Sequence, residues 1–213
     1  METMIGDPEE DAAARVAELQ GEIRACDRCG KAGLIAVAHP VFRGLPGQRM
    51  MVVGQAPAER GHEAVLPYAG ATGVTLRAWL ARAGMGEGEL EARFYLTSLT
   101  KCFPGKSAGG KGDRSPSSTE IGLCAGHLDR EIRLVRPALV LTLGRLSANV
   151  LLGPGSLDEL VGEVWDGERA GNRFRAIALP HPSGVSRWMN LPENRVKHER
   201  ALARLGEIAR ELE

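Results

Sequence analysis

Short apolar runs alternate with helix-like segments along this chain, and this alternation restricts its fold more than any other feature. Runs with the composition of buried strands lie at 49–54, 94–99, 138–144 and 174–179. Segments with helical periodicity or capping signals lie at about 11–25, 70–84, 117–135, 145–152 and 194–212. Strands that alternate with helices predict a three-layer α/β/α fold around a mainly parallel, four-stranded sheet. We expect one domain over 1–213, with 1–24 as an N-terminal helical extension.

The charge balance and hydropathy exclude several protein classes. Lys and Arg total 27, equal to the 27 Asp and Glu residues, so a generally basic surface for nucleic acid is absent and only a local basic patch remains open. No stretch approaches about 18 uninterrupted apolar residues, which predicts no membrane-spanning helix. The first residues carry neither a basic start nor an apolar run, so we expect no signal peptide.

Four cysteines form the clearest candidate for a metal site, and they are Cys26, Cys29, Cys102 and Cys124. Without a targeting segment, disulfide bonds are the weaker interpretation. The first pair has C-x2-C spacing, which lets two thiolates bind one metal centre, and two distant thiolates can complete the set. The spread second pair favours an iron–sulfur cluster over zinc, because a zinc ribbon normally shows a second C-x2-C. Four buried structural thiols remain the third alternative.

Polar and Gly/Pro-containing segments follow three of the predicted strands. They lie at 54–58, 98–101 and 180–184. Ligands of open α/β sheets bind beyond the carboxyl ends of the strands, so we expect these segments to converge on one crevice.

Five short motifs follow one another from about residue 24 to the C-terminus. They are Cys26-Asp27-Arg28-Cys29, Gly54-Gln55-Ala56-Pro57-Ala58, Leu66-Pro67-Tyr68-Ala69-Gly70-Ala71-Thr72-Gly73, Tyr95-Leu96-Thr97-Ser98-Leu99-Thr100-Lys101-Cys102 and His181-Pro182-Ser183-Gly184-Val185-Ser186-Arg187. In this order, and with Cys124, they resemble the iron–sulfur families, usually numbered 4 and 5, of the uracil-DNA glycosylase superfamily. The resemblance implies a monofunctional DNA repair enzyme that flips uracil out of DNA and hydrolyses its glycosidic bond. It also implies a [4Fe-4S] cluster on the four cysteines, with zinc as the alternative.

The resemblance assigns roles to the residues that line the expected crevice. His181 would donate a hydrogen bond to the pyrimidine O2 as negative charge develops there, and Ser183 of the same motif would help to bind the substrate. Tyr68 would stack on the flipped base. Ser98 stands where family 4 has Asn, and its single hydroxyl predicts a broader substrate range that includes other deaminated bases. The backbone around the base would come from Gly54, Ala56 and Pro57.

Two carboxylates of the related families are missing here. Gln55 stands where family 4 has Glu, and Ala71 stands where family 5 has Asp. We expect Glu59, Glu63 or Gln55 to help place the attacking water, although a charged run of this kind is often only a solvated loop.

Basic residues near the crevice are the candidates for DNA binding. A Gly-rich loop with a single acid, Asp113, suits contact with phosphates through Lys101, Lys106, Lys111 and Arg114. Val185 and Arg187 would enter the gap left by the flipped base, or Arg187 would bind phosphate. The Gly-rich loop at 101–114 contains no histidine, so we expect no covalent protein–DNA product.

Other functions stay open at this point. The chain could be a glycosylase for hypoxanthine or xanthine, or a non-catalytic or slow binder of uracil-containing or abasic DNA. A nucleotide hydrolase is disfavoured because the chain has no G-x4-G-K-[ST] loop. The resemblance further implies a monomer in the bacterial cytoplasm, associated with the nucleoid and not with a membrane.

Overall fold

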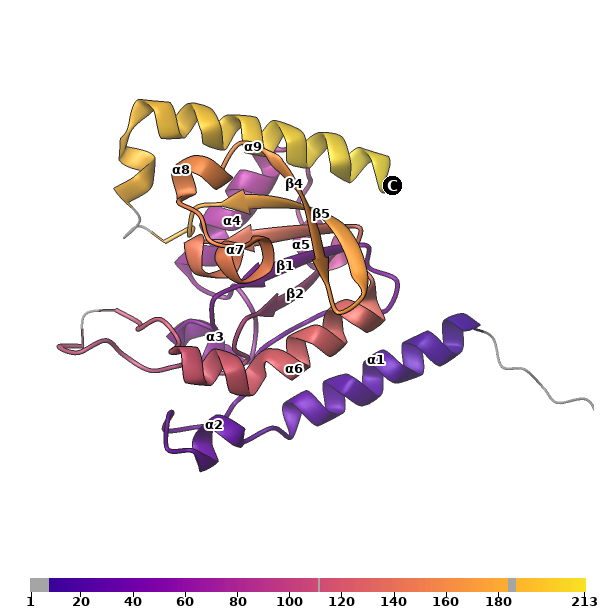
Figure 1. The fold of residues 1–213 in the computed structure, drawn as a ribbon, viewed down its shortest axis with the longest axis vertical. Helices are drawn as coiled ribbons and strands as arrows, with labels where there is room; N and C mark the ends of the chain where they lie inside the picture. The colour runs from indigo at the N-terminus through magenta and orange to yellow at the C-terminus, as the bar shows by residue number, and fades with distance from the viewer. Residues whose placement is uncertain (1–7, 111, 184–186) are drawn as a thin grey trace, which may run out of the picture.

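The computed structural model describes residues 8–110, 112–183 and 187–213 (Figure 1). Within them, five strands form one sheet in the order β2-β1-β3-β5-β4. The strands are β1 (Met50–Gly54), β2 (Phe94–Ser98), β3 (Leu139–Leu143), β4 (Val164–Arg169) and β5 (Asn172–Leu179). All neighbours pair in parallel except β4, which is antiparallel to β5. The three-layer α/β fold is confirmed, and the strand count of four is wrong by one.

The missed strand, β4, lies at the edge of the sheet. Its residues alternate between exposed and partly buried, and its sequence includes Asp166, Glu168 and Arg169. An edge strand with one face in solvent needs no continuous apolar run, so the pattern that reveals β1, β2 and β3 is absent from it.

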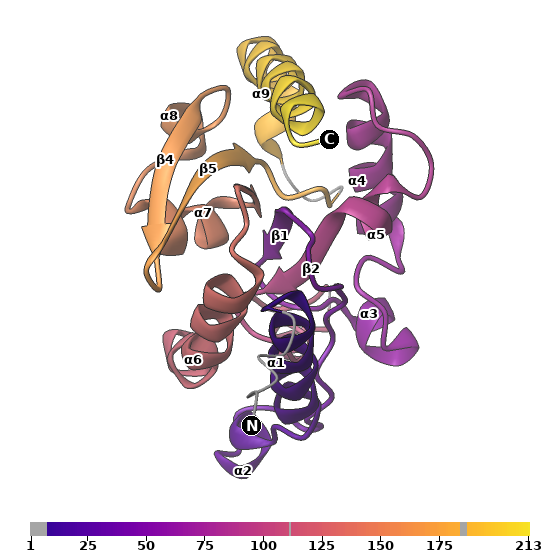
Figure 2. The same ribbon diagram turned by 90° about the vertical axis from the view of Figure 1, so that its right-hand side faces the viewer.

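Alternate residues of β1 divide the interior into two layers. Met50 and Val52 belong to the core that includes residues of α4 (Ala71–Arg82) and α9 (Pro192–Glu211). Met51 and Val53 belong to the opposite core, with residues of α1 (Pro8–Arg24) and α6 (Ser118–Val135). Figure 2 shows these two helix pairs on opposite sides of the sheet. The further helices are α2 (Arg28–Lys31), α3 (Glu59–Ala64), α5 (Glu89–Arg93), α7 (Arg145–Leu152), α8 (Leu157–Leu160) and the 3-10 helix η1 (Arg187–Asn190).

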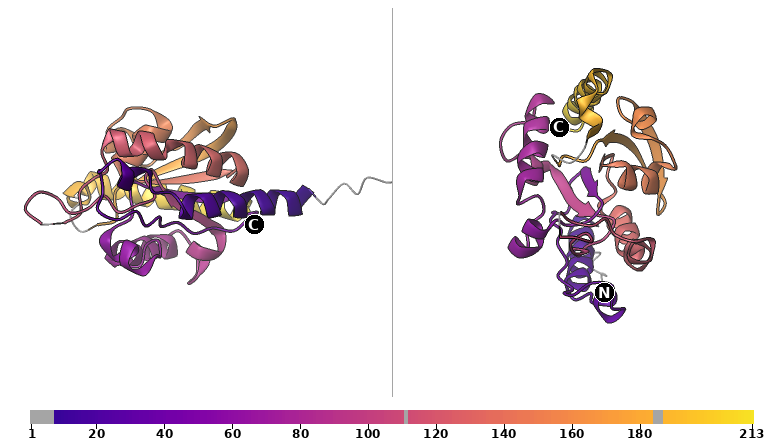
Figure 3. Two further views of the ribbon diagram at one scale, coloured as in Figure 1. Left: turned by 90° about the horizontal axis from the view of Figure 1, so that it is seen from below. Right: turned by 90° about the vertical axis from the view of Figure 1, so that its left-hand side faces the viewer.

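Helix α6 begins where its sequence predicts. The Ser117 side chain accepts from the Glu120 backbone N–H, and the Glu120 carboxylate accepts from the Ser117 backbone N–H, which completes a capping box. The segment between β2 and α6 projects beyond the end of the sheet (Figures 1 and 3). None of the helices in the described part of the chain is long and apolar enough to cross a membrane.

Candidate active site

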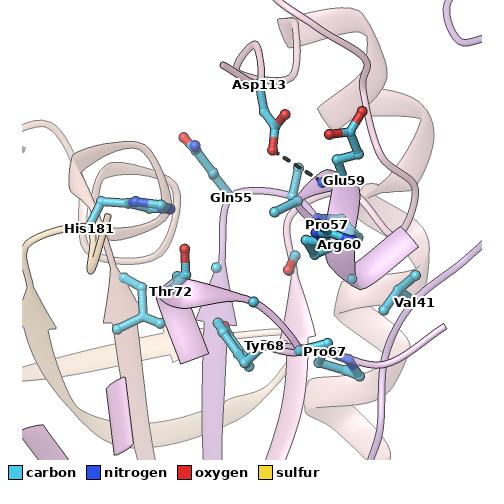
Figure 4. A pocket seen from close by; sticks show the side chains of 18 of the residues that line it. Val41, Gln55, Pro57, Glu59, Arg60, Pro67, Tyr68, Thr72, Asp113 and His181 are labelled. Atoms are coloured by element: carbon cyan, nitrogen blue, oxygen red, sulfur yellow. Dashed lines mark hydrogen bonds between the residues drawn. The ribbon is translucent and has the colours of Figure 1, made fainter. Parts of the chain in front are cut away.

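A pocket of about 190 Å³ lies at the carboxyl ends of the parallel strands. Residues from all three predicted strand-end segments line it, so the predicted crevice is confirmed (Figure 4). The wall contains these predicted catalytic and base-binding residues: Gly54, Gln55, Ala56, Pro57, Glu59, Tyr68, Ser98 and His181. The wall also contains Val41, Arg60, Thr72, Thr97, Lys106, Asp113 and Leu143.

Tyr68 is held at the pocket by an unusual backbone conformation. Its φ of 56° is left-handed, and its carbonyl oxygen packs against α4 so closely that a Cβ on Gly73 would lie 1.8 Å away. Arg77 donates to the same carbonyl at 3.3 Å. Only glycine allows this approach, which explains why the third motif ends in Gly73. The ring is partly exposed, and burial of the hydroxyl raises the pKa of Tyr68.

Gly54 and Ser98 are paired in register at the ends of β1 and β2. A Cβ on Gly54 would lie 3.1 Å from the Tyr68 hydroxyl and 3.2 Å from the Ser98 hydroxyl. A side chain at position 54 would therefore press on both hydroxyls, which favours glycine at this position of the first motif. Ser98 is only 8% exposed, so its hydroxyl is confined to the pocket wall.

His181 reaches the pocket from the end of β5. Its Nδ1 lies 2.9 Å from the Ser183 hydroxyl, and its side chain packs on the backbone of Gly144. Burial lowers the pKa of His181, which favours the neutral imidazole at physiological pH. A Ser183 hydroxyl that donates to Nδ1 leaves the ring proton on Nε2, so the histidine is able to donate a hydrogen bond while neutral.

The candidates for placing water occupy different positions. Gln55 lies in the pocket wall, where its side-chain oxygen accepts from the Ser115 hydroxyl at 3.4 Å. Glu59 also lies in the wall, and its carboxylate pairs with Lys106 at 2.5 Å. Glu63 pairs with exposed Arg60 at 3.4 Å and lies outside the pocket wall, so the structure does not support it as a water-placing residue.

Asp113 is the pocket carboxylate that sequence reasoning overlooked. Its Oδ2 accepts from the Glu59 backbone N–H at 3.1 Å, and its Oδ1 accepts from Lys106 at 3.1 Å. In the sequence it is only the single acid of a basic loop, so no local signal distinguishes it.

The basic residues expected to contact DNA are arranged less simply than the sequence suggests. Lys101 is 2% exposed and pairs with Glu131 at 2.7 Å, so the assignment of Lys101 to phosphate contact is wrong. Lys106 is shared between Glu59 and Asp113, and these hydrogen bonds raise its pKa. Arg114 makes a two-bond contact with Glu120 and donates to the Leu34 carbonyl. Arg187 is exposed at the start of η1, whereas Lys111 and Val185 lie outside the described residues.

The four cysteines line a second, smaller pocket next to the first. Cys26 and Cys29 come from the segment around α2, Cys102 follows β2, and Cys124 lies on α6. None of the four is in a disulfide bond. Among the described residues, no group of three or more His, Cys, Asp or Glu side chains meets the geometry for one metal ion.

Three thiols of this second pocket, those of Cys29, Cys102 and Cys124, are shifted toward protonation. Burial, with a smaller contribution from Cys124, raises the pKa of Cys29 to about 11, and burial raises that of Cys102 to about 12. Burial also raises the pKa of Cys124, although the Lys101 charge and backbone N–H oppose the shift. Four unpaired thiols around one space form a sulfur donor set that suits a thiophilic metal centre.

The fold and the first pocket define an α/β protein with a candidate ligand site beyond the carboxyl ends of parallel strands, lined by a tyrosine and a histidine. Residues 41–205 match the family described as the uracil DNA glycosylase superfamily. The match spans most of the chain, and the chain belongs to this superfamily.

Two curated relatives add detail to this assignment. The chain is 27% identical over 164 residues to a type-4 uracil-DNA glycosylase of Archaeoglobus fulgidus, covering 75% of this chain and 76% of the relative. It is 28% identical over 170 residues to a type-4 uracil-DNA glycosylase of Pyrobaculum aerophilum, covering 78% and 81%. The resemblance inferred from the motifs is therefore confirmed.

Proposed function

We propose that this chain is a monofunctional uracil-DNA glycosylase that binds a flipped uracil and hydrolyses its bond to the sugar. The observation that carries the proposal is the placement of His181, in contact with Ser183, together with Tyr68 and Ser98 in one strand-end pocket. The superfamily match and the type-4 names of the relatives support it. On the resemblance alone, we further propose that it acts as a monomer in a bacterial cytoplasm and takes other deaminated bases as secondary substrates.

Binding begins when the base leaves the DNA stack, at a cost of a few kcal/mol. Stacking on the Tyr68 ring repays about 1 to 3 kcal/mol of this cost. The Ser98 hydroxyl offers one donor and two lone pairs to the base edge, next to Gly54, where no side chain obstructs the ring.

Bond cleavage sends the electron pair of the glycosidic bond into the departing pyrimidine. The neutral His181 donates an N–H hydrogen bond to the developing charge, and Ser183 fixes the ring orientation. A donor aimed at charge that appears only in the transition state lowers the barrier without tightening substrate binding equally.

The second pocket has the donor chemistry for a [4Fe-4S] cluster, which we propose is bound by Cys26, Cys29, Cys102 and Cys124. The cluster would stabilise the fold by holding the segment around α2 to the end of β2 and to α6. Iron and acid-labile sulfide, with a broad visible absorption band lost in Cys124→Ala, would support this assignment. A colourless protein with one bound zinc would overturn it.

The function is tested with labelled oligonucleotides that carry one uracil opposite G, opposite A or in a single strand, followed by alkali cleavage at abasic sites. We expect wild-type cleavage, and a rate for His181→Ala that is lower by about 10²- to 10³-fold with DNA affinity kept. Arg173→Ala, a 90% exposed side chain near the start of β5, is the control and should match the wild type. Uracil left intact by the wild type while DNA still binds would instead identify a binder of damaged DNA.

A further inference from the structure

The segment between β2 and α6 contains a hairpin that presents one carboxylate to the active site. Lys106 and Asp113 face each other as an antiparallel bridge. The Ser107 backbone N–H donates to the Gly112 carbonyl at 2.9 Å, and the Arg114 N–H donates to the Gly105 carbonyl at 3.0 Å. These bonds on both sides of the bridge support Asp113, so the segment is not only a basic loop.

Asp113 joins this hairpin to the pocket wall. One carboxylate oxygen accepts from the Glu59 backbone N–H, at the start of α3, and the other accepts from Lys106. A carboxylate offers about four lone-pair positions, so these two bonds leave acceptor capacity for a water molecule. The Lys106 ammonium lies 3.1 Å from Asp113 Oδ1.

The other carboxylate of the pocket wall is less suited to bind water there. Both carboxylates pair with Lys106, so this ion pair does not separate them, and their directions do. Figure 4 shows the Glu59 carboxylate pointing away from Tyr68 and His181, whereas the Asp113 carboxylate points toward the Glu59 backbone at the edge of the pocket. Among the described residues that line this pocket, Glu59 and Asp113 are the only carboxylates.

We propose that Asp113 binds the attacking water and accepts its proton, replacing the carboxylate that the first motif lacks at Gln55. This inference rests on the proposed function. The water oxygen forms a bond to sugar C1′ while the bond from C1′ to the base nitrogen breaks and its electron pair leaves with the base. The water proton passes to Asp113 and afterwards to the departed base, which restores the carboxylate.

A structural alternative for Asp113 is that it only fastens the hairpin to α3. Asp113→Asn separates the two roles, because asparagine keeps the size of the side chain and an oxygen that accepts from the Glu59 N–H. The same substitution removes the basic carboxylate oxygen that accepts the water proton. Glu59→Gln tests the rival carboxylate, and Glu63→Gln is the matched control on the same helix, outside the pocket wall.

The experiment measures single-turnover excision of uracil across pH, together with affinity for an oligonucleotide that carries an abasic site. For Asp113→Asn we expect a rate lower by about 100-fold or more, with affinity within a few-fold of the wild type. The acid limb of the wild-type pH–rate profile should disappear in this variant, which a purely structural role does not predict. Glu63→Gln should behave as the wild type.

The outcomes separate this inference from the proposed function. Wild-type excision with an equally fast Asp113→Asn would overturn the role of Asp113 alone. A loss confined to Glu59→Gln would transfer the role to Glu59. Absence of excision in the wild type on every uracil substrate would overturn the proposed function and the role of Asp113 with it.

Discussion

Removing the charge of Glu131 should destabilise this protein strongly, because Glu131 is the buried partner of Lys101. The two side chains are 0% and 2% exposed, and Lys101 Nζ lies 2.7 Å from Glu131 Oε2. Glu131 also accepts from the Thr97 hydroxyl at 3.0 Å and from the Tyr95 hydroxyl at 3.3 Å. Lys101 donates in addition to the Ser98 carbonyl at 2.6 Å. Every partner of this ion pair is itself buried, so water cannot replace the lost carboxylate charge.

The loss in the free energy of unfolding follows from the Lys101 ammonium, which Glu131→Gln leaves buried without its carboxylate partner. Breaking a buried ion pair from one side costs about 3–5 kcal/mol, whereas the whole free energy of unfolding of a domain is about 5–15 kcal/mol. At about 2–4 °C per kcal/mol for a chain of this size, the midpoint of thermal unfolding should fall by about 6–20 °C. The double variant Lys101→Met/Glu131→Gln should lose clearly less than the sum of the two single variants.

Circular dichroism during thermal and denaturant unfolding measures these changes, on samples matched for metal content. Glu168→Gln is the control, because Glu168 pairs with Arg173 at 3.1 Å on the surface, where such a pair contributes about 1 kcal/mol or less. A loss below about 1 kcal/mol for Glu131→Gln, equal to that of the control, would refute the argument that the buried charge controls the cost.

Two further predictions concern substrate range and acid stability. Ser98→Asn should narrow the preference toward uracil, measured as the ratio of excision rates for uracil and hypoxanthine; an unchanged ratio would remove Ser98 from base recognition. His198→Leu should flatten the acid side of the stability curve. Burial, followed by the charge of Arg82, lowers the pKa of His198 to about 4 from its ordinary 6.5. The unfolded chain therefore binds a proton below pH 6.5 that the folded chain binds only below about 4. Stability falls as pH falls through this window, by about 3 kcal/mol in total, and denaturant titrations from pH 7 to 4 measure the slope. A slope that persists in His198→Leu would assign the proton uptake to other groups.

The features that follow from local patterns could be predicted from the sequence. β1, β2 and β3 are buried at every position, so their apolar runs are unambiguous. The start of α6 depends on Ser117 and Glu120, three residues apart, which is a local signal. β4 escaped prediction because its exposed face accepts charged residues. The pocket could be predicted because three segments of its wall follow strands that run parallel in one sheet.

The errors at the site concern side chains whose partners are distant in the sequence. Lys101 stands beside Cys102 in a basic segment, and only the fold reveals that its ammonium meets Glu131, thirty residues away on α6. Asp113 gains its place through the backbone of Glu59, 54 residues earlier. Charge counts along a segment describe neither contact, because they contain no information on which way a side chain points.

The end of β2 connects the two pockets through consecutive residues. Thr97 and Ser98 line the base pocket, whereas Thr100, Lys101 and Cys102 line the cysteine pocket. Lys101 links the two sides directly, since its side chain donates to the Ser98 carbonyl while its charge and backbone N–H act on Cys124. A metal centre bound at Cys102 and Cys124 would therefore hold the strand end that presents Ser98 to the base. No cysteine lines the base pocket. The metal centre would therefore affect excision through the position of this strand end and not through the reacting atoms.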